Sequence, residues 1–323
     1  MPNGKSTQPL QPVTVDGTAF VLANGMPFVP VGFNYDHDEH YRLLEDYWVD
    51  EWQKVETDFV AMQRWGATVV RIHLVGLGCY HRTAVPTWYD VLPEQQRWAT
   101  QAFFWHTLAQ RYRGHPAIFC FDLMNEPVVP GRKRHQKGWL GPEFHGKSFV
   151  QFISLDGTQA PRIDIAVRWT RLLVDTIRQA DPQRMITIGL VDWSLPGIEP
   201  QRSGFDPAVI APLLDFVCAH VYPSHGKVDT AVRTVRQFCL GKPLLLDETF
   251  PLRCPVEEID AFLSAVQPLI AGFLGFYTDQ VSPPTTQHHH ERNTLMHAWL
   301  AVFHQQVQQY ARPVSVNACS VSE

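Results

Sequence analysis

The chain has 323 residues, of which 45% are hydrophobic, and its formal net charge is -5. This length and composition are enough to bury a large core, and they allow one catalytic barrel domain to span residues 1–323. No lysine- or arginine-rich face is apparent, so the charge pattern of a nucleic-acid-binding protein is missing and we expect a small neutral partner.

The sequence shows neither a signal peptide nor a membrane span. Its first residues, MPNGKSTQPLQP, contain no apolar run, and no later stretch reaches the roughly 18 consecutive apolar residues of a membrane helix. We therefore expect a soluble protein that is located in the cytoplasm and has no membrane partner. The six cysteines form no CxxC pair, which favours free thiols over disulfides.

The first predicted elements are an N-terminal β-hairpin and two buried strands. Asp16-Gly17 and Asn24-Gly25 are turn signals between short extended runs, and they predict a hairpin over about 13–31. The near-continuous apolar run at 28–35 predicts a strand covered on both faces. A helix that ends near Trp65 follows, and ATVVRIHL at 67–74 supplies the second buried strand.

Five more buried strands are predicted along the rest of the chain. They lie at 117–126, 185–191, 214–222, 243–250 and 271–279, with helical patterns between them such as 163–179. Repeated strand-then-helix units indicate a parallel sheet, and their extent favours an α/β fold of the TIM type, a closed (β/α) barrel, over a doubly wound sheet. A dinucleotide-binding fold is less favoured because no glycine-rich loop follows the first strand.

One interval is too short for a complete barrel. Residues 75–116 separate the second strand from the next, and a predicted helix at about 94–113 uses nearly half of them. The remainder, 75–93, hardly holds a helix of about 10 residues and a strand of about 5 with their loops. We therefore expect either a barrel that lacks one helix–strand unit between strands two and four, or a fused strand, RIHLVGLGCY, in place of two. A flexible C-terminal tail is expected over about 312–323.

Polar residues stand where several of the predicted strands end. Glu126, Asp192, His220 and Glu248 each lie at or directly after the end of an apolar run. In a (β/α) barrel the carboxyl ends of the strands form one mouth, so these side chains should converge there. Two carboxylates on separate strands suit the cleavage of glycosidic bonds, although other reactions also use such a pair.

The segments GFNY, VVRIH, LMNEP, AHVYP and LLLDET, in this order and at roughly even spacing, resemble glycoside hydrolase family 5 and its clan of retaining (β/α)-barrel glycosidases, such as cellulases and mannanases. The resemblance covers nearly the whole chain, and LMNEP is its most specific motif. It implies a hydrolase that cleaves β-glucosidic or β-mannosidic bonds of an oligosaccharide or small glycoside by double displacement through a glycosyl-enzyme. No cofactor is implied.

The resemblance also assigns roles to individual residues. By it, Glu126 is the acid/base and Glu248 the nucleophile. Arg71 matches the arginine of the second strand that orients the nucleophile and favours its ionised form. The Asn125 amide matches the group that binds the sugar 2-hydroxyl.

The pair His220 and Tyr222 matches the residues of strand six that line the subsite of the scissile bond, with Tyr222 able to donate a hydrogen bond to the nucleophile. One departure concerns strand eight, where the family usually has a tryptophan as a sugar-stacking floor. Here Tyr277 stands at this place, so the floor is Tyr277 or is lost.

Further aromatic residues are candidates for a sugar platform, because the apolar faces of pyranose rings pack against aromatic rings. Those in predicted loops near the mouth are Trp88, Trp139 and Trp193. His37 follows the first strand and is a candidate for the sugar pocket. Neither the residues around His37 nor the run at 288–290 has the spacing of a metal site, so no metal is expected.

Two alternatives to a hydrolase remain open. The first is a carbohydrate-binding pseudoenzyme on a barrel damaged by the missing unit, although the presence of both carboxylates and their supporting residues speaks against it. The second is a transglycosylase that uses the same residues.

Overall fold

A computed structural model gives the structure of the chain. It describes residues 10–38, 40, 42–73, 80–81, 89, 91–134, 138–144, 147–150, 152–197, 203–277 and 287–310. Trp88 and the tail at 312–323 fall outside these ranges, as do most of 75–93. Among the helices that the structure describes, none combines the length and hydropathy needed to cross a bilayer.

A small antiparallel sheet forms the N-terminal part of the described chain and confirms the predicted hairpin. It contains β1 (Val13–Asp16), β2 (Ala19–Leu22) and β3 (Pro27–Phe28) in the order β1-β2-β3. Gly17 and Gly25 have φ angles of 58° and 81°, the left-handed conformation that glycine adopts without a steric penalty. Phe20 of β2 is 1% exposed and packs edge-on against Phe216 at 5.0 Å, so the hairpin is anchored to the end of the main sheet where its strands begin.

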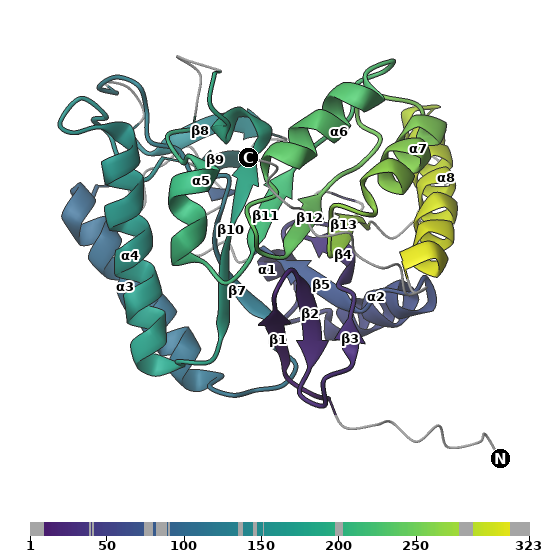
Figure 1. The fold of residues 1–323 in the computed structure, drawn as a ribbon, viewed down its shortest axis with the longest axis horizontal. Helices are drawn as coiled ribbons and strands as arrows, with labels where there is room; N and C mark the ends of the chain where they lie inside the picture. Colours follow the sequence, from purple (N-terminus) through teal and green to yellow (C-terminus); the bar gives the residue numbers. More distant parts are fainter. Residues whose placement is uncertain are drawn as a thin grey trace.

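The main sheet has seven strands, and every neighbouring pair is parallel. Its members are β4 (Val31–Tyr35), β5 (Val69–Ile72), β7 (Cys120–Asn125), β10 (Met185–Val191), β11 (Val217–His220), β12 (Leu244–Glu248) and β13 (Gly272–Phe276). Their spatial order is β5-β4-β13-β12-β11-β10-β7. The sheet curls into an open, partial barrel, and each predicted strand corresponds to one of these seven (Figure 1).

Helices cover the outer face of this sheet (Figure 1). They are α1 (Leu44–Tyr47), α2 (Trp52–Arg64), α3 (Glu94–Arg111), α4 (Arg162–Ala180), α5 (Pro207–Ile210), α6 (Val228–Gln237), α7 (Val256–Val266) and α8 (Gln287–Tyr310), with short 3-10 turns at η1 (Asp192–Ser194) and η2 (Ala211–Leu213). Helices α3 and α4 pack side by side along β7 and β10, and α6, α7 and α8 line up on the other side. A third small sheet, β6 (Tyr80–His81), β8 (Leu140–Phe144) and β9 (Lys147–Val150), has the order β6-β9-β8.

The interior of the molecule is apolar and its helices are fixed by specific contacts. Trp169 of α4 and Trp299 of α8 are both fully buried. The Trp169 indole donates a hydrogen bond to Gln101 Oε1 of α3 at 2.8 Å, which ties the two helices together. Cys120, Cys218 and Cys254 are free thiols, as expected, whereas the expectation is wrong for Cys239, which is disulfide-bonded.

An open seam separates the two edge strands β5 and β7. Among the described residues no strand lies between them, which agrees with the predicted loss of one helix–strand unit. A cavity of about 840 Å³ occupies the seam, and its walls come from both strands and from apolar side chains such as Phe59 of α2 and Trp105 of α3. Arg71 of β5 spans the seam near its carboxyl end through an ion pair with Asp122 of β7, 2.6 Å between Nη2 and Oδ2.

Candidate active site

Consecutive residues of β12 both face the mouth of the barrel because of a shift in register. The shift between β11 and β12 comes just before His220, which pairs with Glu248, so β12 holds one more residue than β11 over this stretch. In a regular strand adjacent side chains point to opposite faces, and a bulge interrupts this alternation. Asp247 and Glu248 therefore both reach His220, at 3.3 Å each.

A second shift, between β7 and β10, precedes the pairing of Asn125 with Gly189. Its effect on β7 is the same: Asp122 and Asn125, which regular alternation would place on opposite faces, both bind Arg71. The Asp122 carboxylate also accepts a hydrogen bond from the Gly189 N–H at 3.0 Å, which links β7 to β10 at the irregularity.

Arg71 is the centre of the hydrogen bonds at the mouth. Its Nε and Nη2 donate to Asp122 Oδ2 at 2.8 and 2.6 Å, and its Nη1 donates to Glu248 Oε1 at 2.7 Å. Nη2 also donates to Asn125 Oδ1 at 3.0 Å. Burial opposes the charge, but three carboxylates, Asp122 foremost, raise the pKa of Arg71 well above its usual value. A permanent buried cation therefore holds Glu248 in place.

Glu248 is held through both of its oxygens. While Oε1 accepts from Arg71, Oε2 accepts from the Tyr222 hydroxyl at 2.7 Å. Burial and the adjacent Glu248 carboxylate raise the pKa of Tyr222 well above its usual value, so the phenol remains a donor. With only 6% of its surface exposed, Glu248 has the fixed orientation that a nucleophile requires.

Glu126 lies opposite Glu248 and is the more accessible of the two, since 25% of its side chain is exposed. It follows β7 with a φ of 48°, and it is the non-glycine residue with a positive φ in the part of the chain that the structure describes. Such a conformation costs energy and is found at functional sites more often than elsewhere. The Glu126 N–H donates to the Gly189 carbonyl at 3.0 Å, which fixes this turn against β10.

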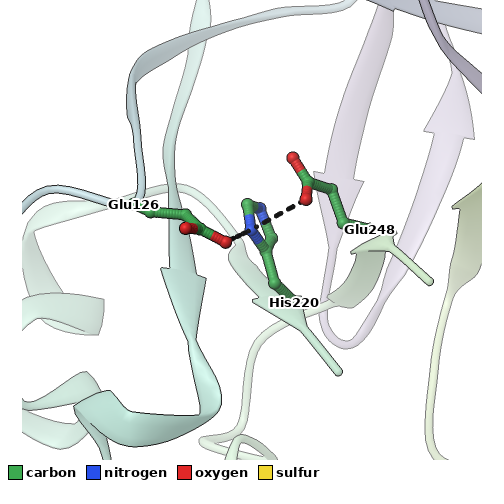
Figure 2. A group of neighbouring side chains, drawn as sticks. All are labelled: Glu126, His220 and Glu248. Carbon is green, nitrogen blue, oxygen red and sulfur yellow. Dashed lines mark hydrogen bonds and ion pairs between the residues drawn. The ribbon is translucent and has the colours of Figure 1, made fainter. Parts of the chain in front are cut away.

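His220 stands between the two glutamates (Figure 2). Its Nδ1 lies 2.8 Å from Glu126 Oε1 and its Nε2 lies 3.3 Å from Asp247 Oδ2. Burial alone would favour the neutral ring, yet Glu248 and then Asp247 raise the pKa of His220 well above its usual value. This direction favours the protonated ring, in which both nitrogens donate.

The absence of a side chain at Gly189 of β10 leaves room for His220 and Arg71. A Cβ at this position would lie 2.7 Å from His220 Nε2 and 2.8 Å from Arg71 Nη2, distances that van der Waals contact excludes. The two cations thus pack directly against the backbone of β10.

Glu126, His220 and Glu248 each offer an atom within 4.8 Å of the others, a spacing that a metal ion could bridge. A metal ion there would need the neutral form of His220, because a protonated ring nitrogen has no free lone pair.

The remaining sequence candidates lie around or away from this cluster. His37 follows β4 and pairs with Asp36, 2.7 Å between Nδ1 and Oδ1. Trp193 lies half-buried in η1, just after β10. Tyr277 follows β13, is 7% exposed and has its ring 5.6 Å from that of Phe33.

Trp139 is 3% exposed and lies beneath the guanidinium of Arg97, 4.1 Å from its ring centre. A face of the Trp139 ring is therefore covered by Arg97 inside the protein. Trp88 is outside the described residues.

Four residues of the cluster received no role from the sequence. They are Asn34, His73, Asp122 and Asp247. Asn34 is fully buried, and its Nδ2 donates to the Asp247 carbonyl at 2.8 Å and to that of Gly275 at 3.0 Å. A lone polar residue inside a buried apolar run, as in GFNY or FDLMN, is the signal that would have revealed Asn34 and Asp122.

Comparisons with known proteins show what the chain is similar to. The cellulase model of glycosyl hydrolase family 5 matches residues 80–239. A mannan endo-1,4-β-mannosidase A from Podospora anserina is 25% identical over 175 residues, which are 50% of this chain and 38% of that protein. The chain therefore spans well under two thirds of this curated relative.

Among solved structures, an exo-β-1,4-mannosidase from Opitutaceae bacterium strain TAV5 has a TM-score of 0.63 at 15% identity, covering 93% of this chain and 64% of that one. An endo-1,4-β-mannanase from Rhizomucor miehei has a TM-score of 0.59 at 15% identity, with 90% and 99% covered. A β-glucanase from Saccharophagus degradans has a TM-score of 0.56 at 14% identity, with 96% of each chain covered. At these identities the likeness concerns the fold.

Proposed function

We propose that the chain is a glycoside hydrolase of family 5 that cleaves β-mannosidic or β-glucosidic bonds with retention of the anomeric configuration. The observation that carries this proposal is the approach of the two glutamates, whose oxygens lie within 4.8 Å of each other. Retaining glycosidases separate their carboxyl groups by about 5–5.5 Å, whereas inverting enzymes leave about 6.5–9.5 Å for a water molecule.

In the first step, Glu248 attacks the anomeric carbon while Glu126 gives a proton to the departing glycosidic oxygen. Glu248, held by Arg71 and Tyr222, and the more open Glu126 suit these two roles. In the second step, Glu126 takes a proton from water as its oxygen attacks the anomeric carbon, and the bond to Glu248 breaks. The proton lost in the first step is thereby restored.

Asn125 is placed to bind the sugar. Its Oδ1 accepts from Arg71 Nη2 at 3.0 Å, and because arginine only donates, the amide orientation is fixed. The Nδ2 then faces away from Arg71, where it is able to donate to a hydroxyl of the sugar. This supports the role of Asn125 at the 2-hydroxyl.

The relatives support the proposed substrate class. Both the curated match and two of the solved structures named above are described as mannosidases or mannanases, and a third is a β-glucanase. We therefore place short β-linked oligosaccharides or small glycosides of mannose and glucose first among candidate substrates.

Turnover of aryl β-mannosides and β-glucosides by wild type and Glu248→Ala tests the proposal. We expect wild type to release the aryl group and Glu248→Ala to lose at least about 1,000-fold in kcat, because the nucleophile is gone. External azide should restore part of this activity by replacing the carboxylate. Glu257→Ala, which removes an exposed glutamate of α7, is the matched control and should keep full activity.

Proton NMR of the first product formed gives the stereochemistry. Retention is expected, and the inverted anomer would refute the mechanism. Binding without turnover across the whole panel would favour the pseudoenzyme, and transfer of the glycosyl group to an added sugar acceptor would favour the transglycosylase.

A further inference from the structure

Asp247 is the most deeply buried acid of the site, and the reaction outlined above does not use it. Its side chain is 1% exposed, so it has no surface with which to touch a sugar. It owes its inward position to the bulge of β12, and its backbone carbonyl is held by the Asn34 amide at 2.8 Å. Any effect of Asp247 on the reaction must therefore pass through a neighbour.

Its two charged neighbours are His220 and Arg71. Asp247 Oδ2 accepts from His220 Nε2 at 3.3 Å and lies 3.6 Å from Arg71 Nε. Arg71 already donates from two of its nitrogens to Asp122, whereas the Nε2 of His220 has Asp247 as its hydrogen-bond acceptor among the described residues. The contact that Asp247 alone supplies is therefore the hydrogen bond to Nε2 of the imidazole ring, the nitrogen that does not contact Glu126.

From this geometry we propose that Asp247 is a positioning residue for the acid/base: it holds the His220 ring so that the Nδ1 proton points at Glu126 and supplies the proton that Glu126 delivers. The proposal rests on the function proposed above. An aspartate that binds one nitrogen of an imidazole fixes the ring and stabilises its charged form, as in other carboxylate–histidine pairs.

The charges that contact His220 come from the ends of two strands. Glu126 directly follows β7, and Asp247 and Glu248 belong to β12. On the side of β10 the ring lies against Gly189, which brings no charge. Anions outnumber cations in this cluster. Burial opposes the charge of Asp247, but the neighbouring His220 and Arg71 lower its pKa, so Asp247 remains ionised.

The charge of Glu248 couples proton binding by the Glu126–His220 pair to the formation of the glycosyl-enzyme. In the free enzyme the Glu248 carboxylate, 3.3 Å from His220 Nδ1, stabilises the imidazolium. When Glu248 bonds to the anomeric carbon, that negative charge is lost, and the Glu126–His220 pair holds its proton less tightly. The proton passes from the pair to the glycosidic oxygen at this moment, and water returns one proton when the glycosyl-enzyme is hydrolysed.

The test compares Asp247→Asn with wild type on two substrate types. An activated aryl glycoside hardly needs a proton on its leaving group, whereas an alkyl glycoside or disaccharide does. We expect Asp247→Asn to slow the poor leaving group by about 10- to 100-fold and the activated substrate by only a few-fold. Glu126→Ala removes the acid/base itself and should show the largest difference in slowing between the two substrate types.

The pH profile supplies a readout that a loss of packing alone would not move. Removing the negative charge of Asp247 weakens proton binding by the Glu126–His220 pair, so the alkaline limb of kcat/KM should move to lower pH by about one unit. Asp122→Asn is the matched control, because it removes another carboxylate of the cluster, one that binds Arg71 and not His220. It should slow both substrate types alike.

A measurement on wild type keeps the test independent of folding in the variants. Imidazole nitrogen NMR of histidine-labelled protein, with the His220 signals identified by their loss in His220→Gln, should show a doubly protonated ring at pH 7. A neutral ring, or equal slowing of both substrates by Asp247→Asn with an unmoved alkaline limb, would overturn the inference while leaving the proposed hydrolase intact. A wild type without turnover would instead refute the proposed function.

Discussion

Four buried or half-buried carboxylates lie close together at the site. Arg71 and His220 supply the positive charge that offsets the repulsion between them. Burying an ion costs several kcal/mol unless a partner compensates it. Each cation here touches at least two anions. In the proposed reaction the two glutamates make and break bonds, and the two aspartates balance the charge of the site.

His73 is a further residue of the site, and its position predicts a role in binding. The ring is 7% exposed, and Arg71 Nη1 donates to its Nε2 at 3.0 Å, a shorter contact than the 3.2 Å to Asn34 Oδ1. Because arginine only donates, the ring proton lies on Nδ1, for which the described residues offer no hydrogen-bond partner. Burial and Arg71 lower the pKa of His73, so the ring is neutral.

An unsatisfied buried donor costs about 1–3 kcal/mol, and a sugar hydroxyl would relieve that cost on binding. We expect His73→Ala to raise KM about tenfold with a smaller change in kcat, because the hydrogen bond serves ground state and transition state alike. Steady-state kinetics on an oligosaccharide measure this. His73→Gln should recover part of the affinity, and an unchanged KM in both variants would remove His73 from the binding site.

The strand ends of the site were predictable from the sequence, but the irregularities within the strands were not. Glu126 and Glu248 stand in motifs at the ends of apolar runs, and the structure brings both to His220 as expected. Asp247 follows the same run, yet regular alternation would turn it away from Glu248. The bulge that reverses this arises from pairing with β11, and pairing between distant segments leaves no local pattern in the sequence.

Helix α8 packs on β13 at a place where only glycine fits. A Cβ at Gly275 would lie 2.0 Å from Trp299 Cζ2, and Trp299 is fully buried with its indole donating to the Phe276 carbonyl at 3.1 Å. We expect Gly275→Ala to lower the free energy of unfolding by about 1–3 kcal/mol, the usual range for overpacking a core. Chemical denaturation measures the difference.

The pair Gly275→Ala and Trp299→Phe tests whether this contact is the cause. A smaller ring leaves room for the new methyl group, so the double variant should be more stable than the sum of the two single effects predicts. Strict additivity would locate the strain elsewhere.

For the molecule as a whole, the residue count between strands two and four was the most informative part of the sequence. It predicted a missing unit, and β5 and β7 are the edges of the sheet in the part of the chain that the structure describes. What the count could not give is how the opening is bridged. Arg71 and Asp122 do this with side chains instead of a backbone ladder, because each sits at an inward-facing position of its edge strand.

The seam predicts how the protein behaves at high concentration. Among the described residues β5 and β7 each have one unpaired edge, and these edges and the apolar cavity between them favour contact with a second copy, since barrel closure normally removes such edges. Ile72 of β5 lies at this opening with 41% of its surface exposed. We expect wild type to self-associate as concentration rises and Ile72→Lys to reduce this, because a charge on an edge strand opposes pairing.

Light scattering over a concentration series measures the average mass. Val209→Lys, which places the same charge at a 46% exposed valine of α5, is the matched control and should leave self-association unchanged. A wild type that stays monomeric throughout, or an equal response of both variants, would mean that the seam is not the contact.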